Sequence, residues 1–325
     1  MGKLAMIEAF ERGLSAVPTA LAVTAGIGVE PLPPGRVLSV GTGSSEGPAR
    51  LLADRPRAGG AAATFMAPSR FFVDDVPPDA EQCALVVFSQ SISPNARQVL
   101  ERASRFRHVV LVTAAPPEDL PDMHVVRHPG VEELEGPTRL VGSACAAMIA
   151  LKLSGCAADY PLIGPAYEAA LREPEPPLDP RAQKLFVALD AGGASLPHLV
   201  HKWIAAVRGP LPFACDPLGA AHGALQALTG HRPVVVSFEH GGSQAKDGER
   251  EIFDRFFSVA GRMGAISRRL VATLPEPLAF FEHDASLAAL ALATLREHGE
   301  YLQSTWPTGM DKPLYDMGSR PPPAP

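Results

Sequence analysis

The chain has 325 residues and a formal net charge of −6 at pH 7, and 46% of its residues are hydrophobic. This length suits two domains, and the hydrophobic share is sufficient for a sizeable core. No run of Lys and Arg stands out, which argues against nucleic acid as a partner.

The first half of the chain alternates predicted strands and helices. An amphipathic helix comes first, because Leu4, Ile7, Phe10 and Leu14 recur near helical spacing, and EPLPPGR ends this segment. Strands are then predicted at RVLSVG, AAATFMA, ALVVFS, HVVLVT and MHVVR, and helices at GPARLLA, PNARQVLERAS and residues 138–153. Continuous apolar strands between helices are typical of a parallel sheet that is covered on both faces.

The same alternation restarts after a linker. Residues 172–183, REPEPPLDPRAQ, are dense in Pro and charge, which is typical of a domain boundary. Beyond them, strands are predicted at KLFVAL, LPFAC, RPVVVSF and LAFFEH, and helices at LPHLVHKWIAAV, PLGAAHGALQAL, REIFDRFFSVAGRM and ASLAALALATLREHGEYL. We therefore expect a helical segment at 1–30, a first domain at 31–171, the linker, a second domain at 184–318 and a disordered tail at 319–325.

The cysteines and the apolar segments predict a cytoplasmic protein. None of the four cysteines forms a C-x-x-C pair, so we expect free thiols and a reducing compartment. Glu8, Glu11 and Arg12 interrupt the N-terminal segment, which therefore lacks the continuous apolar core of a signal peptide. The segment RLVGSACAAMIALKLSG is too short to span a membrane and contains Lys152, so we expect no membrane partner.

Two loops rich in small polar residues follow predicted strands of the first half, where ligands bind in open parallel sheets. They are SVGTGSSEGPA, with Gly41, Thr42, Gly43, Ser44 and Ser45, and FSQSISPNA, with Ser89, Gln90, Ser91 and Ser93. Glycines allow a ligand to approach the backbone closely, and hydroxyls at helix N-termini suit a phosphate. The alternative is structural, since such residues also cap helices and Pro94 suits the first helical position after a Ser93 cap. Neither loop matches a G-x-G-x-x-G or Walker motif.

Taken in order, these motifs resemble the sugar isomerase (SIS) domain family, in its tandem form found in the isomerase half of glucosamine-6-phosphate synthase. SVGTGSS stands in the place of the family's GTS-type loop, and SQSISP stands in the place of SQSGET. ELEGPTR, which begins near Glu132 or Glu133, stands in the place of EIGVASTK. AHGAL stands in the place of HGP, and MDKPLYDMG of the tail DQPRNLAKS. The resemblance spans roughly residues 30–318, although only the SQS turn is close in letters, and we expect no glutaminase half.

The resemblance implies an α/β fold of two SIS-type, flavodoxin-like halves. Each would be a three-layer αβα structure with a mainly five-stranded parallel sheet. It also implies a sugar phosphate as ligand, no cofactor, and a homodimer. By position, Ser89 and Ser91 match the phosphate-contacting serines, Gln90 the glutamine between them, Thr42 the loop threonine near the sugar, and His222 the histidine associated with ring opening. Gly43 and Ser44 belong to the same loop as Thr42.

The chain departs from the family pattern at positions that matter for catalysis. Ile92 stands where the family has a glycine, and Pro137 stands where it has the serine of STK. Pro94 stands where the family has a phosphate-binding threonine, whose hydroxyl Ser93 could supply instead. Ala206 stands where the family has its glutamate base, and Gly318 where it has a ring-opening lysine. Proton transfer between the sugar's C1 and C2 requires a base, which alanine cannot provide.

Four other residues are candidates for the missing acid–base chemistry: His201, Lys202, Glu239 and His240. The structural alternative is that His201 and Lys202 lie on a solvated helix face and that Glu239 and His240 belong to a polar turn, EHGG. The predicted function is an aldose–ketose isomerase, or a related deaminase or deglycase, acting on a sugar or aminosugar phosphate. The alternatives are a non-catalytic phosphosugar sensor or scaffold and a biosynthetic enzyme that uses the fold for other chemistry. The dispersed histidines favour no metal site.

Overall fold

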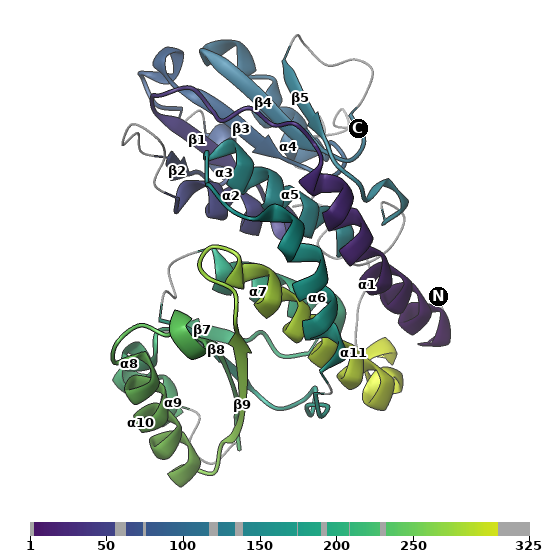
Figure 1. The fold of residues 1–325 in the computed structure, drawn as a ribbon, viewed down its shortest axis with the longest axis vertical. Coiled ribbons are helices and arrows are strands. Elements are labelled where there is room, and N and C mark those ends of the chain that lie inside the picture. The colour runs from purple at the N-terminus through teal and green to yellow at the C-terminus, as the bar shows by residue number, and fades with distance from the viewer. Residues whose placement is uncertain are drawn as a thin grey trace, which may run out of the picture. The chain divides into compact units, whose positions relative to one another are not determined.

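A computed structural model describes residues 3–55, 63–73, 76–116, 123–133, 139–173, 175–189, 194–207, 209–227 and 232–304. The chain forms two compact units (Figure 1). Thr19–Tyr160 make up the five-stranded unit, and Met1–Pro18 with Pro161–Trp306 make up the four-stranded unit. Helix α1 (Lys3–Ala25) contributes to both, because the division falls at Pro18 within it.

The five-stranded unit is a parallel sheet with the strand order β2-β1-β3-β4-β5. Its elements in chain order are β1 (Val37–Val40), α2 (Glu46–Ala53), β2 (Ala63–Phe65), α3 (Ser69–Phe72), β3 (Ala84–Phe88), α4 (Pro94–Leu100), β4 (His108–Thr113), β5 (His124–Arg127) and α5 (Val141–Leu153).

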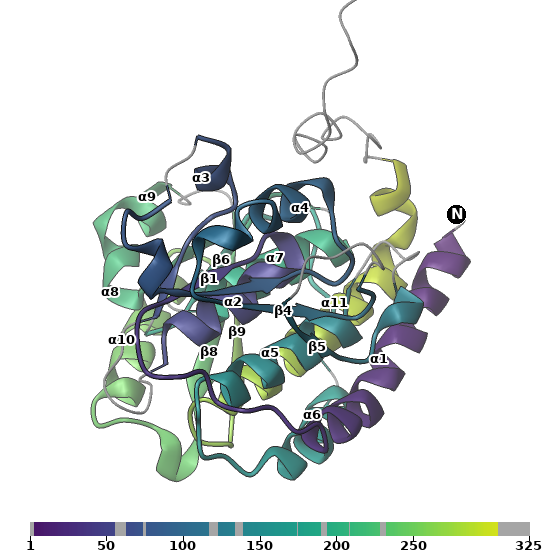
Figure 2. The same cartoon turned by 90° about the horizontal axis from the view of Figure 1, so that it is seen from above.

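Helices cover both faces of this sheet, as Figure 2 shows from above. Val86 and Phe88 of β3 pack with α2 and α5 on one face, whereas Leu85 and Val87 pack with α3 and α4 on the other. All five residues of β3 are buried, because successive side chains point to opposite faces and both faces are covered.

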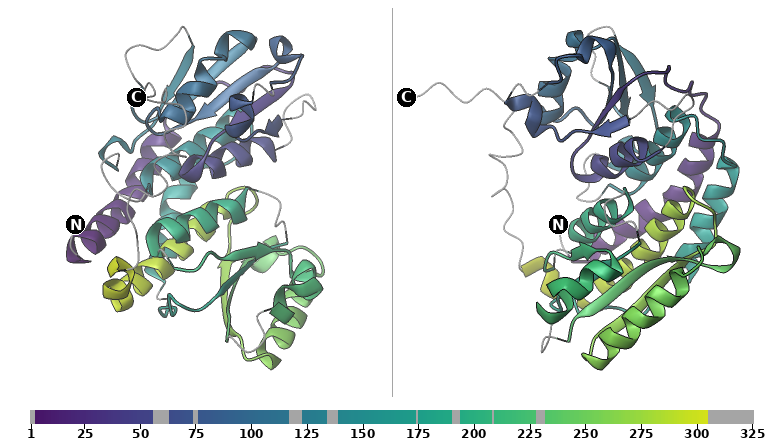
Figure 3. Two further views of the ribbon diagram at one scale, coloured as in Figure 1. Left: turned by 180° about the vertical axis from the view of Figure 1, so that it is seen from behind. Right: turned by 90° about the vertical axis from the view of Figure 1, so that its left-hand side faces the viewer.

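The four-stranded unit is also a parallel sheet, with the strand order β7-β6-β8-β9. Its elements are α6 (Ile163–Arg172), β6 (Lys184–Val187), α7 (Ser195–Val207), β7 (Phe213–Cys215), α8 (Pro217–Gly219), α9 (Leu225–Ala227), β8 (Val234–His240), α10 (Glu249–Arg262), β9 (Ile266–Ala272) and α11 (Ala279–Ser304). Helix α10 lies along one face of the sheet in both views of Figure 3, and α7 and α11 cover the other.

The predicted alternation of strands and helices is confirmed except near the end of the chain. LAFFEH, predicted as a strand, instead ends a turn and begins helix α11. The last strand among the described residues is β9, ISRRLVA, which was not predicted. The expected five strands are correct for the first sheet and wrong for the second, which has four strands among the described residues. The two sheets agree with the expected two halves, whereas the domain boundaries drawn from composition remain a prediction.

Two predicted helices differ in detail. The helix expected over residues 138–153 begins at Val141, and Thr138 lies outside the described residues. The helix expected at PLGAAHGALQAL is interrupted, because His222 has φ −95° and ψ 42° and Gly223 has φ 125°. In the described part of the chain, no helix is long and apolar enough to cross a lipid bilayer.

Candidate functional site

The two polar loops of the five-stranded unit line a single pocket of about 450 Å³. Strands β1 and β3 are parallel neighbours, with Val40 paired to Val87, so their carboxyl ends and the loops that follow lie side by side. All the predicted binding residues line this pocket: Thr42, Gly43, Ser44, Ser89, Gln90, Ser91 and Ser93. The sequence motifs therefore placed these residues on one site, although their roles remain a prediction.

Glycines shape the first loop. A Cβ atom on Gly41 would lie 2.2 Å from the carbonyl oxygen of Ser45, so no larger residue fits without moving the backbone. Gly43 has φ +59°, a conformation that favours glycine. Together they turn the chain sharply from β1 into the 3₁₀ turn Gly43–Ser45 and helix α2, with hydroxyls at the pocket wall.

The hydroxyls of the second loop also have structural partners. Ser89 Oγ donates to the carbonyl oxygen of Ser91 at 2.7 Å. Ser93 Oγ accepts from the backbone N–H of Ala96 at 3.2 Å, and Pro94 is the first residue of α4. The predicted capping role of Ser93 is therefore confirmed. Because a hydroxyl can donate and accept at once, capping leaves the Ser93 proton available to a ligand.

Gln90 is the buried polar residue of this turn. Its backbone oxygen accepts from Ala114, Ala115 and the Thr113 hydroxyl, which fixes the turn to the end of β4. Only 6% of the residue is exposed, and within the described structure neither atom of its side-chain amide has a hydrogen-bond partner. A Cβ on Gly142 would lie 2.6 Å from the Gln90 amide nitrogen, so glycine makes room for this side chain. An unpaired buried amide at a pocket wall is suited to bind a polar ligand.

Arg139 also lines the pocket, although the sequence analysis did not single it out as a site residue. It is the one charged residue among the described residues that line this pocket. It is the last residue of ELEGPTR, at the place of the lysine of EIGVASTK, so the motif itself held a signal for a cationic residue. Nearby, the Glu133 carboxylate accepts from the backbone N–H groups of Leu140, Val141 and Gly142 at 2.8–3.0 Å. Glu133 is therefore the acidic cap of α5, which stabilises the N-terminus of that helix.

The predicted catalytic residues lie in the four-stranded unit. His222 is exposed at the interruption between α8 and α9. Lys202, whose alternative was a solvated helix face, is buried and forms an ion pair with Asp284 at 2.5 Å, so that alternative is wrong. Ala206 is buried on the same helix. His201 is partly buried.

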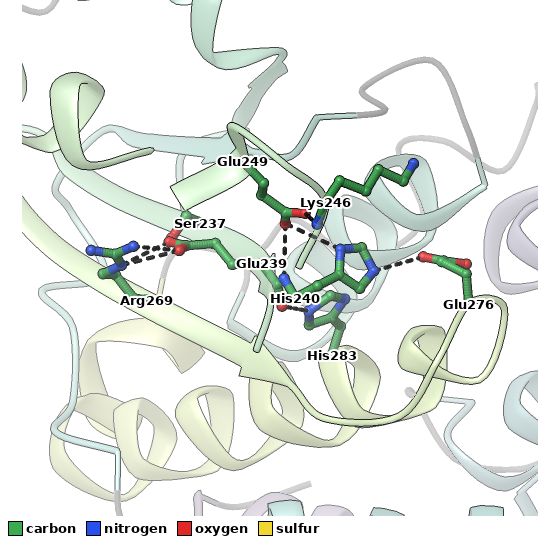
Figure 4. A network of polar contacts seen from close by, with 8 residues as sticks. All are labelled: Ser237, Glu239, His240, Lys246, Glu249, Arg269, Glu276 and His283. Atoms are coloured by element: carbon green, nitrogen blue, oxygen red, sulfur yellow. Dashed lines mark hydrogen bonds and ion pairs between the residues drawn. The ribbon is translucent and has the colours of Figure 1, made fainter. Parts of the chain in front are cut away.

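Glu239 and His240 end strand β8, and Figure 4 shows their partners. The buried Glu239 carboxylate accepts hydrogen bonds from Arg269, of which the shortest is 2.6 Å, and these raise the pKa of that arginine. His240 lies between two carboxylates, with Nδ1 3.1 Å from Glu249 and Nε2 3.0 Å from Glu276. The carboxylate and the imidazole of EHGG are thus held by ion pairs at the end of β8, and the chain leaves the strand at Gly241.

The structure brings all predicted binding residues together, whereas the predicted catalytic residues occupy separate places. Lys202 belongs to a buried cluster on α7, His222 is exposed at a helix interruption, and Glu239 and His240 share the end of β8. No group of three or more possible metal ligands occurs among the described residues. Gly318 and Pro137 lie outside them.

Comparison with known proteins identifies the fold. No family model and no curated protein matches the chain. Solved structures do. The C-terminal domain of glucosamine-fructose-6-phosphate aminotransferase from Francisella tularensis has a TM-score of 0.66 at 11% identity, over 90% of this chain and 96% of that one. Glucosamine-6-phosphate deaminase from Thermotoga maritima has a TM-score of 0.65 at 13% identity, over 89% of this chain and 95% of that one.

Tagatose-6-phosphate ketose/aldose isomerase from Escherichia coli has a TM-score of 0.63 at 14% identity, over 91% of each chain. The chain therefore has the α/β fold of these phosphosugar-converting proteins, as the resemblance to SIS domains implied. Identities this low establish the fold alone, since one fold supports many functions.

Proposed function

We propose that the pocket of the five-stranded unit binds a sugar phosphate, with the phosphate at the turn from Ser89 to Ser93. The observation that carries the proposal is the composition of the pocket wall. Six hydroxyl residues, the unpaired Gln90 amide and Arg139 line it. Hydroxyls and a guanidinium are the donors that suit a phosphate, and a volume near 450 Å³ lies in the range of about 300–1,000 Å³ usual for small-molecule sites.

The proposal predicts that the Ser89→Ala/Ser91→Ala variant binds glucosamine 6-phosphate or fructose 6-phosphate more weakly by about 1–3 kcal/mol, the value of charge-assisted hydrogen bonds. Isothermal titration calorimetry measures this. Glucosamine without its phosphate should not bind detectably. Ser15→Ala, an exposed serine on α1, is the matched control and should leave the affinity unchanged. Equal affinity of the double variant and the parent would exclude a phosphate at this turn.

Isomerisation or deamination of the bound sugar is the second candidate function. The observation that favours it is the fold shared with glucosamine-6-phosphate deaminase and tagatose-6-phosphate ketose/aldose isomerase. Lys202 and Glu239 are engaged in ion pairs, which favours binding without turnover.

Proton NMR in deuterated water separates the two candidates. Exchange of the C2 hydrogen of fructose 6-phosphate or glucosamine 6-phosphate supports catalysis. Saturable binding without exchange or product supports a sensor or scaffold. A homodimer, as the resemblance implies, is part of the proposal, and no cofactor is required for this chemistry. A cytoplasmic location likewise remains a proposal.

A further inference from the structure

The turn after β8 in the four-stranded unit is the topological counterpart of the turn after β3. In each unit this strand is the third in chain order, and it pairs with the first strand on one side and the fourth on the other. Each turn leads from the carboxyl end of the strand into a helix, α4 after β3 and α10 after β8. The two turns therefore occupy the place where an open parallel sheet binds its ligand.

A carboxylate of the chain fills the turn after β8. Glu249 is 2% exposed. Its Oε1 accepts from the backbone N–H of His240 at 2.9 Å and lies 3.1 Å from the Nδ1 of the same residue, while Oε2 accepts from the backbone N–H of Lys246 at 3.1 Å (Figure 4). Burial raises the pKa of Glu249, but these hydrogen bonds outweigh it and lower the pKa overall, so the group is an anion.

The His240 ring is the cation of this arrangement. Both of its nitrogens face carboxylates, Glu249 on α10 and Glu276 before α11, and a neutral imidazole could donate to only one of them. The ring centroid of His283 on α11 lies 6.0 Å from that of His240. Burial lowers the pKa of His283 to about 4, so this second ring is neutral. The neighbouring Glu239 carboxylate is paired with Arg269 and does not compete.

We infer that the turn after β8 is an anion-binding site that the chain occupies with its own Glu249 carboxylate. Two backbone N–H groups and an imidazolium are donors that bind phosphate or carboxylate ligands elsewhere. In the five-stranded unit, by contrast, no carboxylate belongs to a described residue that lines the pocket. The inference predicts that the site accepts an external small anion once the carboxylate side chain is removed.

The test uses the full chain carrying Ser89→Ala and Ser91→Ala, so that the proposed sugar phosphate site cannot contribute. Glu249→Ala is added, and the melting temperature is measured against sodium acetate and inorganic phosphate, with chloride at matched ionic strength. We expect the alanine variant to melt below its parent and to regain stability saturably with acetate or phosphate. Glu249→Gln fills the same space without charge and should show no saturable gain. An equal response of parent, Gln and Ala variants would overturn the inference.

A second measurement covers the case in which Glu249→Ala does not fold. The pKa of the His240 ring is followed by NMR in the parent and in Glu249→Gln. We expect it to fall in the variant, because one of the two carboxylates that favour the charged ring is gone. Glu251→Gln, an exposed change two residues along α10, is the matched control and should leave that pKa unchanged. An unchanged His240 pKa in Glu249→Gln would overturn the inference.

Discussion

At the scale of single residues, Gly41 determines whether the pocket can form. Its missing side chain lets the carbonyl of Ser45 approach the backbone, and a Cβ atom there would meet that oxygen at 2.2 Å. The contact is with backbone, which cannot rotate away as a flexible side chain could. The turn that presents Thr42 and Ser44 to the pocket therefore depends on glycine at this position.

We predict that Gly41→Ala destabilises the protein by about 1–3 kcal/mol, the usual cost of overpacking, and weakens sugar phosphate binding. Chemical denaturation and calorimetry measure the two effects. Gly28→Ala is the control, because a Cβ atom on Gly28 would meet no atom within 4 Å and this glycine has no positive φ. Its stability should stay the same or rise by up to about 1 kcal/mol. Matching behaviour of the two variants would contradict the steric argument.

At the scale of elements, one buried carboxylate joins three helices of the four-stranded unit. Asp284 on α11 accepts from the Tyr167 hydroxyl of α6 at 2.8 Å and lies 2.6 Å from Nε2 of His198 and 2.5 Å from Nζ of Lys202, both on α7. Burial raises the pKa of Asp284, but Lys202 and His198 outweigh it and the pKa is lowered. A buried charge of this kind is tolerated because its partner is equally buried.

Removing one partner should therefore cost much more than removing both. Asp284→Ala is expected to lower the free energy of unfolding by about 3–5 kcal/mol, because Lys202 is left buried and unpaired, and adding Lys202→Met should recover part of the loss. Glu168→Ala breaks an exposed pair with Arg172 on α6 and should cost at most about 1 kcal/mol. Urea denaturation measures all three. A loss for Asp284→Ala no greater than for Glu168→Ala would refute the role of the cluster.

The burial pattern of each strand and helix explains which of them could be predicted from the sequence. Central strands such as β3 and β4 are continuous apolar runs, which are easily recognised as parallel strands. LAFFEH is also largely apolar, but its helix is buried along this whole stretch, so the run lacks a helical period and resembles a strand. Strand β9 lies at the sheet edge, where Arg268 and Arg269 interrupt the apolar pattern.

The candidate site was predictable in part for a similar physical reason. Short glycine and hydroxyl loops after apolar strands are local signals, and the parallel register then brings them together. Arg139 ends the ELEGPTR segment, so its place in that motif could have pointed to it, whereas the contacts that hold the buried Lys202 and Glu249 depend on residues from other elements. Such contacts have no local pattern, so they could not be recognised before the fold was known.

At the scale of the whole molecule, the described lining of the pocket belongs to one compact unit. Every described residue that lines it lies between Val40 and Arg139, inside Thr19–Tyr160. That unit has its own five-stranded sheet with hydrophobic clusters on both faces. The C-terminal end of α1 is fixed within it, because Lys152 Nζ donates to the carbonyls of Ala25 and Ile27 at 2.7 Å.

We therefore predict that a fragment of residues 19–160 folds and binds the same sugar phosphate as the full chain. The cut at Thr19 removes Phe10, Leu14 and Val17, buried residues of α1 that belong to the other unit and would otherwise be exposed. A cooperative thermal transition by circular dichroism tests folding, and calorimetry with glucosamine 6-phosphate tests binding. The Ser89→Ala/Ser91→Ala fragment is the control for the site. A fragment that unfolds cooperatively yet does not bind would show that the ligand requires groups from outside this unit, because the pocket itself would be intact.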